Sequence, residues 1–272
     1  MRSSIRSLLY KSRSPAGSVL GPIPYLLFTP DLPTSESLIS GTFADDTAIL
    51  ATHSDPKIAS QILQKGLNDI SHWLKKWRIK ANETKSVNVT FTLIRGSCPP
   101  VTLNNIVVPQ ADNVRYLGLY LDKRLTWQKL IFSKRKQLGI QTRKLYWLIR
   151  RKSQLSLENK ILLYKAILKL IWTYGIQLWC TASHSNIEIL QRFQNKAVRM
   201  ITNAPWYVPN EFLHHDLRLY TVKQEILRHT RTYKERIERH PNILARPLMA
   251  NHNKARRLKR KIPQDLIQIQ TQ

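Results

Sequence analysis

The chain has 272 residues, 42% of them hydrophobic, which allows one large domain or two modest ones and argues against global disorder. Its 44 Lys and Arg oppose 17 Asp and Glu, and this excess points to a polyanion such as nucleic acid, with a solubilising basic surface or acidic lipid as alternatives. The two cysteines, Cys98 and Cys180, have no Cys or His at zinc-ligand spacing, which excludes a zinc finger and fits a reducing compartment.

The stretch from Ser14 to Pro33 opens with small residues and continues as an apolar segment. Gly17 and Ser18 form a flexible turn, whose free backbone N–H groups suit a phosphate or a closely packed base. Pro22 and Pro24 interrupt the apolar segment that follows. An ordinary loop that leads into a short helix explains the same pattern, so the residues alone leave both interpretations open.

Two adjacent carboxylates, Asp45 and Asp46, lie between two apolar runs that favour strands. This pattern predicts a β-hairpin with the acid pair at its tip. On an exposed turn the pair is ordinary, because Asp is a common turn residue. At the mouth of a cleft it is a Mg²⁺ ligand, since that ion prefers carboxylate oxygen and leaves room for substrate phosphates.

Residues 55–80 carry apolar side chains at spacings of three and four, which predicts an amphipathic helix. Asp55 suits the N-cap, and Pro56 suits the first helical position. The opposite face carries lysines, so the apolar face is expected to cover one side of a sheet. Trp73 and Trp77 belong to that apolar face and are predicted to be core residues rather than platforms for bases.

Short strands are predicted next. Apolar and polar residues alternate over residues 86–93, which predicts a half-buried strand. Two short apolar runs flank Asn104 and Asn105, a pair that suits a tight hairpin turn. In the block 114–122, Gly118 has two interpretations. It allows a phosphate or another strand to approach closely, or it forms a bulge in an ordinary sheet strand.

From Thr126 onward the pattern is helical, so the change near Lys123 marks the predicted domain boundary. A helix is predicted over residues 127–152. Its cations are Lys129, Lys134, Arg135, Lys136, Arg143, Lys144, Arg150, Arg151 and Lys152. No acid lies between Lys123 and Glu158, so we interpret this series as a track for phosphates rather than only a solvated face.

The remaining segments also predict helices. Residues 157–180 are apolar on nearly all sides, which predicts a central buried helix, and the lysines near its middle argue against a membrane span. Capping-box pairs predict two later helix starts, one at Ser185 with Glu188 and one at Thr221 with Gln224. A basic run over residues 251–261 follows the last helix.

Four blocks occur in a fixed order along the first half of the chain. They are Pro15-Ala16-Gly17-Ser18-Val19-Leu20-Gly21-Pro22, Asp31-Leu32-Pro33, Phe43-Ala44-Asp45-Asp46 and Tyr116-Leu117-Gly118. In this order they resemble the reverse transcriptase of non-LTR retrotransposons, most of all the jockey group. Ala16 stands where that family has Gln, and Pro24 stands where it has Leu. Several ordered blocks are far more specific than any one of them.

The resemblance implies an α+β fold, in which a polymerase palm-like antiparallel sheet with packed helices is followed by an all-α thumb-like region. The expected parts are a partial reverse transcriptase palm at residues 1–122 and a helical thumb-like region at 123–220. A C-terminal helix and basic tail are expected at residues 221–272.

The resemblance also implies RNA-directed DNA synthesis by two-metal phosphoryl transfer, with Mg²⁺ or Mn²⁺. Asp45 and Asp46 are the implied metal ligands, and Lys85 is the implied catalytic cation near the triphosphate. The other implied contacts are the nucleotide and template pocket (Gly17, Ser18, Phe43, Ala44), the primer grip (Tyr116, Leu117, Gly118) and phosphate-binding residues (Lys134, Arg135, Lys136, Arg143, Lys144). From the residues alone, a solvated lysine at a helix end explains Lys85 equally well.

The implied partners are an RNA template, a DNA primer and deoxynucleoside triphosphates, with no membrane, and the implied location is intracellular, in the nucleus. A family palm uses a third aspartate on a strand before the Gly-Ser block, and residues 1–13 contain no acid. We therefore expect an N-terminally truncated copy, lacking fingers, that is inactive by itself. The alternatives are a non-catalytic nucleic-acid-binding remnant and an unrelated basic helical protein, of which the latter does not explain the ordered blocks.

Overall fold

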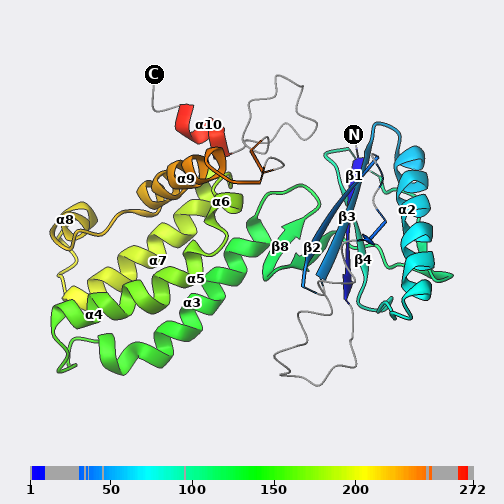
Figure 1. The fold of residues 1–272 in the computed structure, drawn as a ribbon. Coiled ribbons are helices and arrows are strands. Elements are labelled where there is room, and N and C mark those ends of the chain that lie inside the picture. The colour runs from blue at the N-terminus through cyan, green and yellow to red at the C-terminus, as the bar shows by residue number, and fades with distance from the viewer. Residues whose placement is uncertain are drawn as a thin grey trace. The chain divides into compact units, whose positions relative to one another are not determined.

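The computed structural model describes residues 2–9, 31–33, 35, 37–44, 46–94, 96–242, 245–246 and 263–268. The chain divides into two compact units, Met1–Leu125, which holds the described strands, and Thr126–Gln272, in which the described elements are helices (Figure 1). Helices together with small antiparallel sheets confirm the coarse class predicted from the sequence, a mixed α and β chain.

The first unit is built on a four-stranded antiparallel sheet with strand order β2-β3-β1-β4. Its strands are β1 (Arg2–Leu9), β2 (Leu38–Phe43), β3 (Asp46–His53) and β4 (Val87–Phe91). Strand β1 lies inside the sheet, because it pairs with β3 on one side and with β4 on the other. The sequence does not predict β1, since three serines and two arginines among its eight residues hide any apolar alternation.

Helix α2 (Pro56–Lys76) covers one face of this sheet (Figure 1). It begins as predicted, because the Asp55 carboxylate accepts a hydrogen bond from the Lys57 backbone N–H at 2.7 Å. The core between helix and sheet includes Ile49, Ala51, Leu63, Leu67 and Ile70, which are at most 3% exposed. The apolar face predicted from the sequence therefore packs on strand β3.

The C-terminal end of α2 differs from the prediction, since the helix stops at Lys76 rather than Lys80. Arg78 takes the left-handed backbone conformation with φ 53°, which ends the helix. The backbone N–H groups of Arg78 and Ile79 then donate to carbonyls in the last helical turn. An arginine in this conformation gives no sequence signal, because glycine is the usual residue there.

Strand β4 is buried on both faces rather than on one. The polar residues Asn88, Thr90 and Thr92 are all at most 7% exposed. The Asn88 N–H donates to the Pro109 carbonyl at 2.9 Å, and the Asn88 carbonyl accepts from the Ala111 N–H at 3.0 Å. The segment around Gln110 therefore pairs with the edge of β4 through an isolated parallel bridge to Asn88.

Two short hairpins complete the first unit. They are β5 (Thr102–Leu103) with β6 (Ile106–Val107), and β7 (Asn113–Tyr116) with β8 (Leu119–Asp122). Both turns contain two residues with positive φ, as a type I′ turn requires. Asn104 and Asn105 form the first turn, as predicted, and Leu117 and Gly118 form the second.

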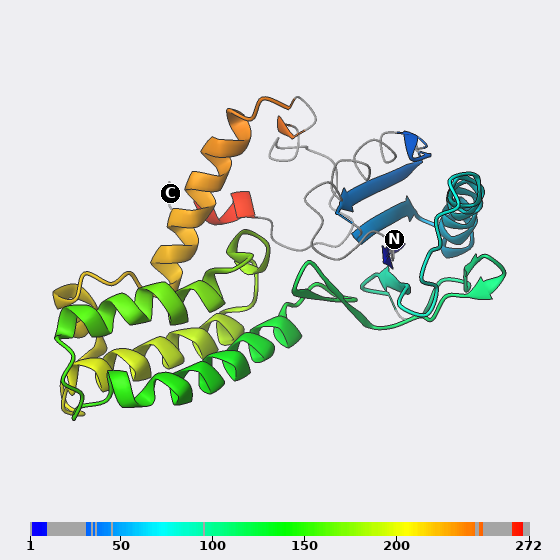
Figure 2. The same ribbon diagram turned by 60° about the horizontal axis from the view of Figure 1, so that its bottom comes forward.

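The second unit is assembled from helices. They are α3 (Gln128–Ile149), α4 (Leu157–Leu163), the π-helical η2 (Tyr164–Lys169), α5 (Leu170–Thr173), α6 (Ile176–Trp179), α7 (His184–Thr202), α8 (Asn210–Asp216), α9 (Val222–Glu238) and α10 (Pro263–Gln268). Helix α7 contacts α3 and α4, and these segments run side by side in Figure 2. Among the described helices, none is long and apolar enough to cross a membrane.

The segment predicted as one central helix, residues 157–180, is interrupted. The π-helical η2 follows α4, and Tyr174 leaves the helical conformation with ψ 124°. Gly175 has φ 65°, which a glycine adopts without a Cβ clash, so the chain bends there. Leu162 and Leu170 are 61% and 62% exposed, which corrects the expectation that this segment is buried all round.

The later helix starts are partly as predicted. Thr221 and Gln224 form the predicted capping box of α9. The N-cap of α7 is Ser183 instead of the predicted Ser185, because the Ser183 hydroxyl accepts a hydrogen bond from the Asn186 backbone N–H. The predicted basic run over residues 251–261 lies outside the described residues.

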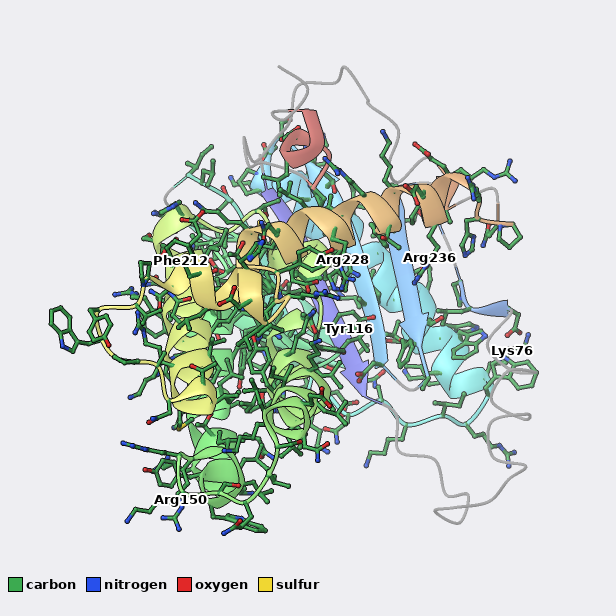
Figure 3. The ribbon with its side chains drawn as sticks, turned by 90° about the vertical axis from the view of Figure 1, so that its left-hand side faces the viewer. Lys76, Tyr116, Arg150, Phe212, Arg228 and Arg236 are labelled. Atoms are coloured by element: carbon green, nitrogen blue, oxygen red, sulfur yellow. The ribbon has the colours of Figure 1, made fainter. Side chains whose placement is uncertain are left out.

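A buried ion network joins α9 to η2. Glu225 of α9 has 0% exposure and forms an ion pair with Lys169, the last residue of η2. Arg228, labelled in Figure 3, places its Nη2 2.8 Å from the second oxygen of Glu225, and His229 Nε2 lies 3.6 Å from it. Burying a carboxylate removes it from water at a cost in free energy. These partners offset that cost.

Candidate active site

The β2–β3 hairpin carries the acid pair. Phe43 pairs with Asp46, so two residues, Ala44 and Asp45, join the strands. The predicted hairpin is therefore confirmed, with Asp46 as the first residue of β3, while Asp45 lies outside the described residues. Ala44 has φ 49°, a left-handed conformation that costs a residue with a Cβ on the order of 1 kcal/mol.

Asp46 belongs to the sheet face that α2 leaves open. Side chains alternate along a strand, and Ile49 and Ala51 of β3 are fully buried on the α2 side. Asp46 and Ala48 therefore belong to the opposite face, where both are half-buried. Phe43, paired with Asp46, has a side chain that is 64% exposed. The hairpin thus presents a carboxylate and an aromatic ring beside each other.

The β7–β8 hairpin comes close to Asp46. Tyr116, the last residue of β7, is half-buried, and burial raises the pKa of its phenol. The negative charge of Asp46 raises this pKa further, because it disfavours the phenolate. The sequence predicts the β2–β3 hairpin as a metal-binding segment and the β7–β8 hairpin as a primer grip. The two hairpins thus interact electrostatically through Asp46 and Tyr116. Leu117 and Gly118 form the turn beyond Tyr116.

Lys85 lies toward the same end of the sheet as Asp46. It is exposed in the turn that precedes β4. Val87 of β4 pairs with Ser7 of β1, and Leu9 of β1 pairs with Asp46. One strand, β1, therefore separates β3, which begins with Asp46, from β4, which follows Lys85, and this places β3 and β4 about 10 Å apart at the usual strand spacing. Gly17 and Ser18, the other predicted nucleotide contacts, lie outside the described residues.

Asp31 has a role that the sequence does not reveal. Its two carboxylate oxygens accept hydrogen bonds from the indole N–H of Trp73 at 3.0 Å and of Trp77 at 3.1 Å. Trp73 is 8% exposed, as predicted for the core, whereas Trp77 is 37% exposed at the end of α2. The Asp31-Leu32-Pro33 block is therefore fixed to the C-terminal end of α2. The sequence shows two tryptophans spaced four residues apart, but no nearby residue indicates that both will bind the distant Asp31.

Lys134 was predicted to bind phosphate, and the structure corrects that expectation. Its side chain is 5% exposed, and its ammonium donates to the carbonyls of Ile171 and Tyr174 at 2.9 Å each. Burial lowers the pKa of this ammonium to about 8. Lys134 thus satisfies carbonyl groups at the end of α5, where helices leave such groups unpaired.

The other predicted phosphate contacts of α3 differ in exposure. Arg135 is half-buried, and its guanidinium lies 5.1 Å from the centre of the Phe193 ring of α7. Lys136, Arg143 and Lys144 are exposed. Of the five cations predicted to bind phosphate, these three are available to a ligand.

Comparison with known proteins finds a family similarity over the first unit. Residues 2–121 match the family model described as reverse transcriptase (RNA-dependent DNA polymerase). This part of the chain is similar to reverse transcriptases. The matched residues include both the β2–β3 hairpin and the β7–β8 turn, so one family match covers both hairpins.

Curated relatives extend this similarity over most of the chain. The probable RNA-directed DNA polymerase from transposon X-element of Drosophila melanogaster is 42% identical over 258 residues, which cover 93% of this chain and 28% of that protein. The polymerase from transposon BS is 39% identical, and that from mobile element jockey of Drosophila funebris is 34% identical over 98% of this chain and 31% of that protein. The chain therefore spans less than a third of the length of these relatives.

Reverse transcriptases generally use a divalent metal ion, which the donor set here fits in part. A carboxylate oxygen such as that of Asp46 suits Mg²⁺. Within the described ranges, however, no three His, Cys, Asp or Glu residues gather closely enough to hold an ion. Strand β1, which lies beside Asp46, carries no acid, and Leu9 is the residue paired with Asp46. The described residues therefore do not complete a metal site.

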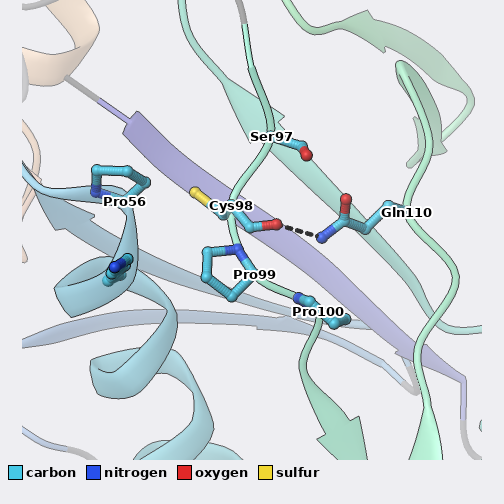
Figure 4. Close-up of a pocket in the computed structure, with 7 residues that line it drawn as sticks. Pro56, Ser97, Cys98, Pro99, Pro100 and Gln110 are labelled. Atoms are coloured by element: carbon cyan, nitrogen blue, oxygen red, sulfur yellow. Dashed lines mark hydrogen bonds between the residues drawn. The ribbon is translucent and has the colours of Figure 1, made fainter.

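A pocket of about 480 Å³ lies at the other end of β3 (Figure 4). It is lined by Pro56, Lys57, Ser97, Cys98, Pro99, Pro100 and Gln110. The Gln110 side-chain amide donates to the Cys98 carbonyl at 2.7 Å across its wall. Pro56 begins α2 just after β3 ends, whereas Asp46 begins β3, so a full strand separates the pocket from the acid hairpin. This pocket is therefore not part of the reverse transcriptase site.

Proposed function

We propose that this chain is part of the RNA-directed DNA polymerase of a transposon. The observation that carries the proposal is the electrostatic interaction between Asp46 and Tyr116, which brings the acid hairpin and the Tyr-Leu-Gly hairpin within range of each other. The family match and the transposon relatives support it. The partners in this proposal are an RNA template, a DNA primer and deoxynucleoside triphosphates, and the proposed location is the nucleus.

The first unit acts as the palm in this proposal. Asp45 and Asp46 would hold Mg²⁺ or Mn²⁺, and the ion would supply charge neutralisation at the transferred phosphoryl group. Lys85 lies toward the same end of the sheet and neutralises the incoming triphosphate. Phe43 and Ala44 border the nucleotide on the open face of the sheet. Gly17 and Ser18 are also nucleotide contacts in this proposal, on the resemblance alone.

Tyr116, Leu117 and Gly118 hold the primer backbone in this proposal. The exposed Gly118 at the turn allows a phosphate to approach the backbone closely. The second unit acts as a thumb-like region, and the exposed cations of α3 contact phosphates. Because Lys134 is buried, it is excluded from this surface.

Two-metal chemistry uses a carboxylate that is shared between the ions. Strand β1 does not supply one, since the residue paired with Asp46 is Leu9. We therefore infer that a third acid from elsewhere in the polymerase completes the site. The 272-residue polypeptide is expected not to extend a primer unaided.

A chimera tests the proposal. In the X-element polymerase, the aligned segment is replaced by this chain, and extension of a DNA primer on an RNA template is measured with Mg²⁺. We expect Asp46→Ala to slow extension by about 100-fold or more, because charge stabilisation at the reacting phosphate is lost. Asp69→Ala is the matched control, since Asp69 is an exposed acid on α2.

Each outcome of this experiment has a defined meaning. Extension that survives Asp46→Ala contradicts the catalytic assignment. Extension by the unaided chain that Asp46→Ala abolishes contradicts the inferred third acid, because the site is then complete within this sequence. A chimera that binds template and primer but never extends supports the non-catalytic binding alternative instead.

A further inference from the structure

Helix α3 has an exposed face that combines apolar and cationic side chains. Its buried residues, among them Leu130, Ile131 and Leu138, belong to the side that packs on α7 and α5. On the opposite side, five exposed residues recur at spacings of three and four. We call these residues the outer stripe: Phe132, Lys136, Ile140, Arg143 and Trp147. This spacing places them within an arc of about 80° on the helix.

The outer stripe is unlike an ordinary solvated helix face, which is polar. Phe132 is 53% exposed, Ile140 is 41% exposed and Trp147 is 65% exposed. Within the described residues, neither aromatic ring stacks on another ring or on a cation. Cations alternate with these apolar groups, and α3 contains no acid. A ligand of this surface must therefore offer negative charge and flat apolar surface together.

Single-stranded nucleic acid offers both kinds of group, because its bases are unpaired and its backbone is anionic. A duplex presents its phosphates but keeps its base faces stacked inside. We propose that the outer stripe binds single-stranded nucleic acid, with bases stacked on Phe132 and Trp147 and phosphates paired with Lys136 and Arg143. The inference rests on the proposed function, which makes nucleic acid the partner of the second unit.

The dimensions of α3 suit a short single strand. The interval from Phe132 to Trp147 is about 22 Å at the helical rise of about 1.5 Å per residue. A stacked strand advances about 3.4 Å per nucleotide, so about six nucleotides connect the two rings. Arg150, labelled in Figure 3 at the C-terminal end of α3, is exposed and extends the cationic path beyond Trp147.

The charge of the whole second unit favours the same class of ligand. Residues 126–272 contain 29 Lys and Arg against 8 Asp and Glu. An apolar protein partner would leave Lys136 and Arg143 desolvated without counter-charges, which is unfavourable. A flexible single strand supplies a phosphate for each of them.

The test measures fluorescence anisotropy with the full chain and three labelled probes. The probes are an oligo(dT) strand, a matched abasic strand and a duplex, each of about 12 nucleotides per strand so that both rings are spanned. Replacing both rings, by Phe132→Ala with Trp147→Ala, is expected to weaken oligo(dT) binding about tenfold or more. Binding of the abasic strand and of the duplex is expected to stay unchanged, because these probes engage only the cations.

Two further variants serve as controls. Trp206→Ala with Phe212→Ala removes aromatic groups that are 90% and 63% exposed elsewhere in the second unit, and it is expected to bind oligo(dT) like the wild type. Lys136→Ala with Arg143→Ala is expected to weaken binding of all three probes. Thermal unfolding of each variant confirms that the fold is intact, since all the replaced side chains are exposed.

Unchanged oligo(dT) affinity in the Phe132 and Trp147 double variant overturns the stacking proposal while leaving the proposed function intact. An equal loss in the Trp206 and Phe212 control also overturns it, because the effect is then not specific to α3. Failure of the wild-type chain to bind any of the three probes contradicts both this inference and the nucleic-acid role in the proposed function.

Discussion

The two units of this chain differ in how they distribute charge. Residues 1–125 contain 15 Lys and Arg against 9 Asp and Glu, whereas residues 126–272 contain 29 against 8. In the first unit an acid lies at a hairpin tip beside Tyr116, with a lysine toward the same end of the sheet. In the second, α3 presents exposed cations and no acid. Metal chemistry needs carboxylates, while a polyanion surface needs cations, so we assign the two proposed roles to different units.

The units also differ in where their acids lie, and the difference predicts separate responses to substitution. In the second unit, the acid with the ion-pair network is buried. Glu225 is fully enclosed, and its partners are Lys169, Arg228 and His229. In the first unit Asp31 is exposed, and it fixes a surface segment through two indole groups. The carboxylate of Glu225 is therefore part of the core of the second unit, whereas the carboxylate of Asp31 is at the surface of the first unit.

The largest expected effect comes from Glu225→Ala, which leaves the half-buried Lys169 without its counter-charge. We expect the second unit to lose about 3–5 kcal/mol of unfolding free energy in urea titrations. Glu235→Ala, at an exposed position of the same helix, is the control. A double replacement, Lys169→Met with Glu225→Leu, is expected to be less harmful than Glu225→Ala. Equal losses for Glu225→Ala and Glu235→Ala would show that the network does not stabilise the unit.

Asp31→Ala is expected to destabilise the first unit by about 1–3 kcal/mol, because two indole N–H groups lose a charged acceptor. The effect falls toward the lower end of this range, since Asp31 is exposed. Asp31→Asn is expected to be intermediate because it keeps one acceptor oxygen. Urea unfolding followed by tryptophan fluorescence measures both variants, and Asp69→Ala serves as the control. An Asp31→Ala variant with the unfolding free energy of the wild type would mean that the two hydrogen bonds make no net contribution to stability.

A substitution at Ala44 is expected to stabilise the first unit. Ala44→Gly removes the left-handed strain at φ 49° and should raise the unfolding free energy by up to about 1 kcal/mol. Ala48→Gly is the matched control within β3, and there the same change should destabilise by about 0.5–1 kcal/mol. Calorimetry should show these opposite signs. Destabilisation by both substitutions would contradict the strained turn.

The smallest expected effect concerns pH and the second unit. Burial lowers the pKa of His214 below its ordinary value of 6.5, although its hydrogen bond with the Leu219 carbonyl opposes this shift. The unfolded chain therefore binds a proton more readily, so stability is lost as pH falls below about 6.5. The midpoint of thermal unfolding should fall with pH, and His214→Gln should weaken this dependence. The exposed neighbour His215→Gln is the control, and equal slopes for both variants would contradict the assignment.

The parts of the structure that the sequence predicts correctly are those with local signals. The Asp55 cap, the Asn104-Asn105 turn, the Thr221 capping box and the Asp45-Asp46 hairpin each depend on residues a few positions apart. Local hydrogen-bonding and backbone preferences specify such features directly. The candidate site followed from the same kind of signal, together with the order of the family blocks.

The parts that could not be predicted depend on distant contacts. Nothing near Lys134 indicates that the carbonyls of Ile171 and Tyr174 will bury its ammonium. Strand β1 acquires its place through pairing with β3 and β4 rather than through its own pattern. The sequence does not reveal that the rings of the outer stripe are exposed, because helical spacing alone does not say which face meets solvent.

The division of roles between the two units is tested most directly by the salt dependence of template–primer affinity. We predict that the logarithm of the association constant falls linearly with the logarithm of salt concentration, as for a protein that contacts phosphates. Replacing Lys136, Arg143 and Lys144 by alanine should reduce this slope by about 2–3 in total, while Asp46→Ala should leave it unchanged. An affinity that does not depend on salt, or a slope that the triple variant leaves unaltered, would contradict the assignment of nucleic-acid binding to the second unit.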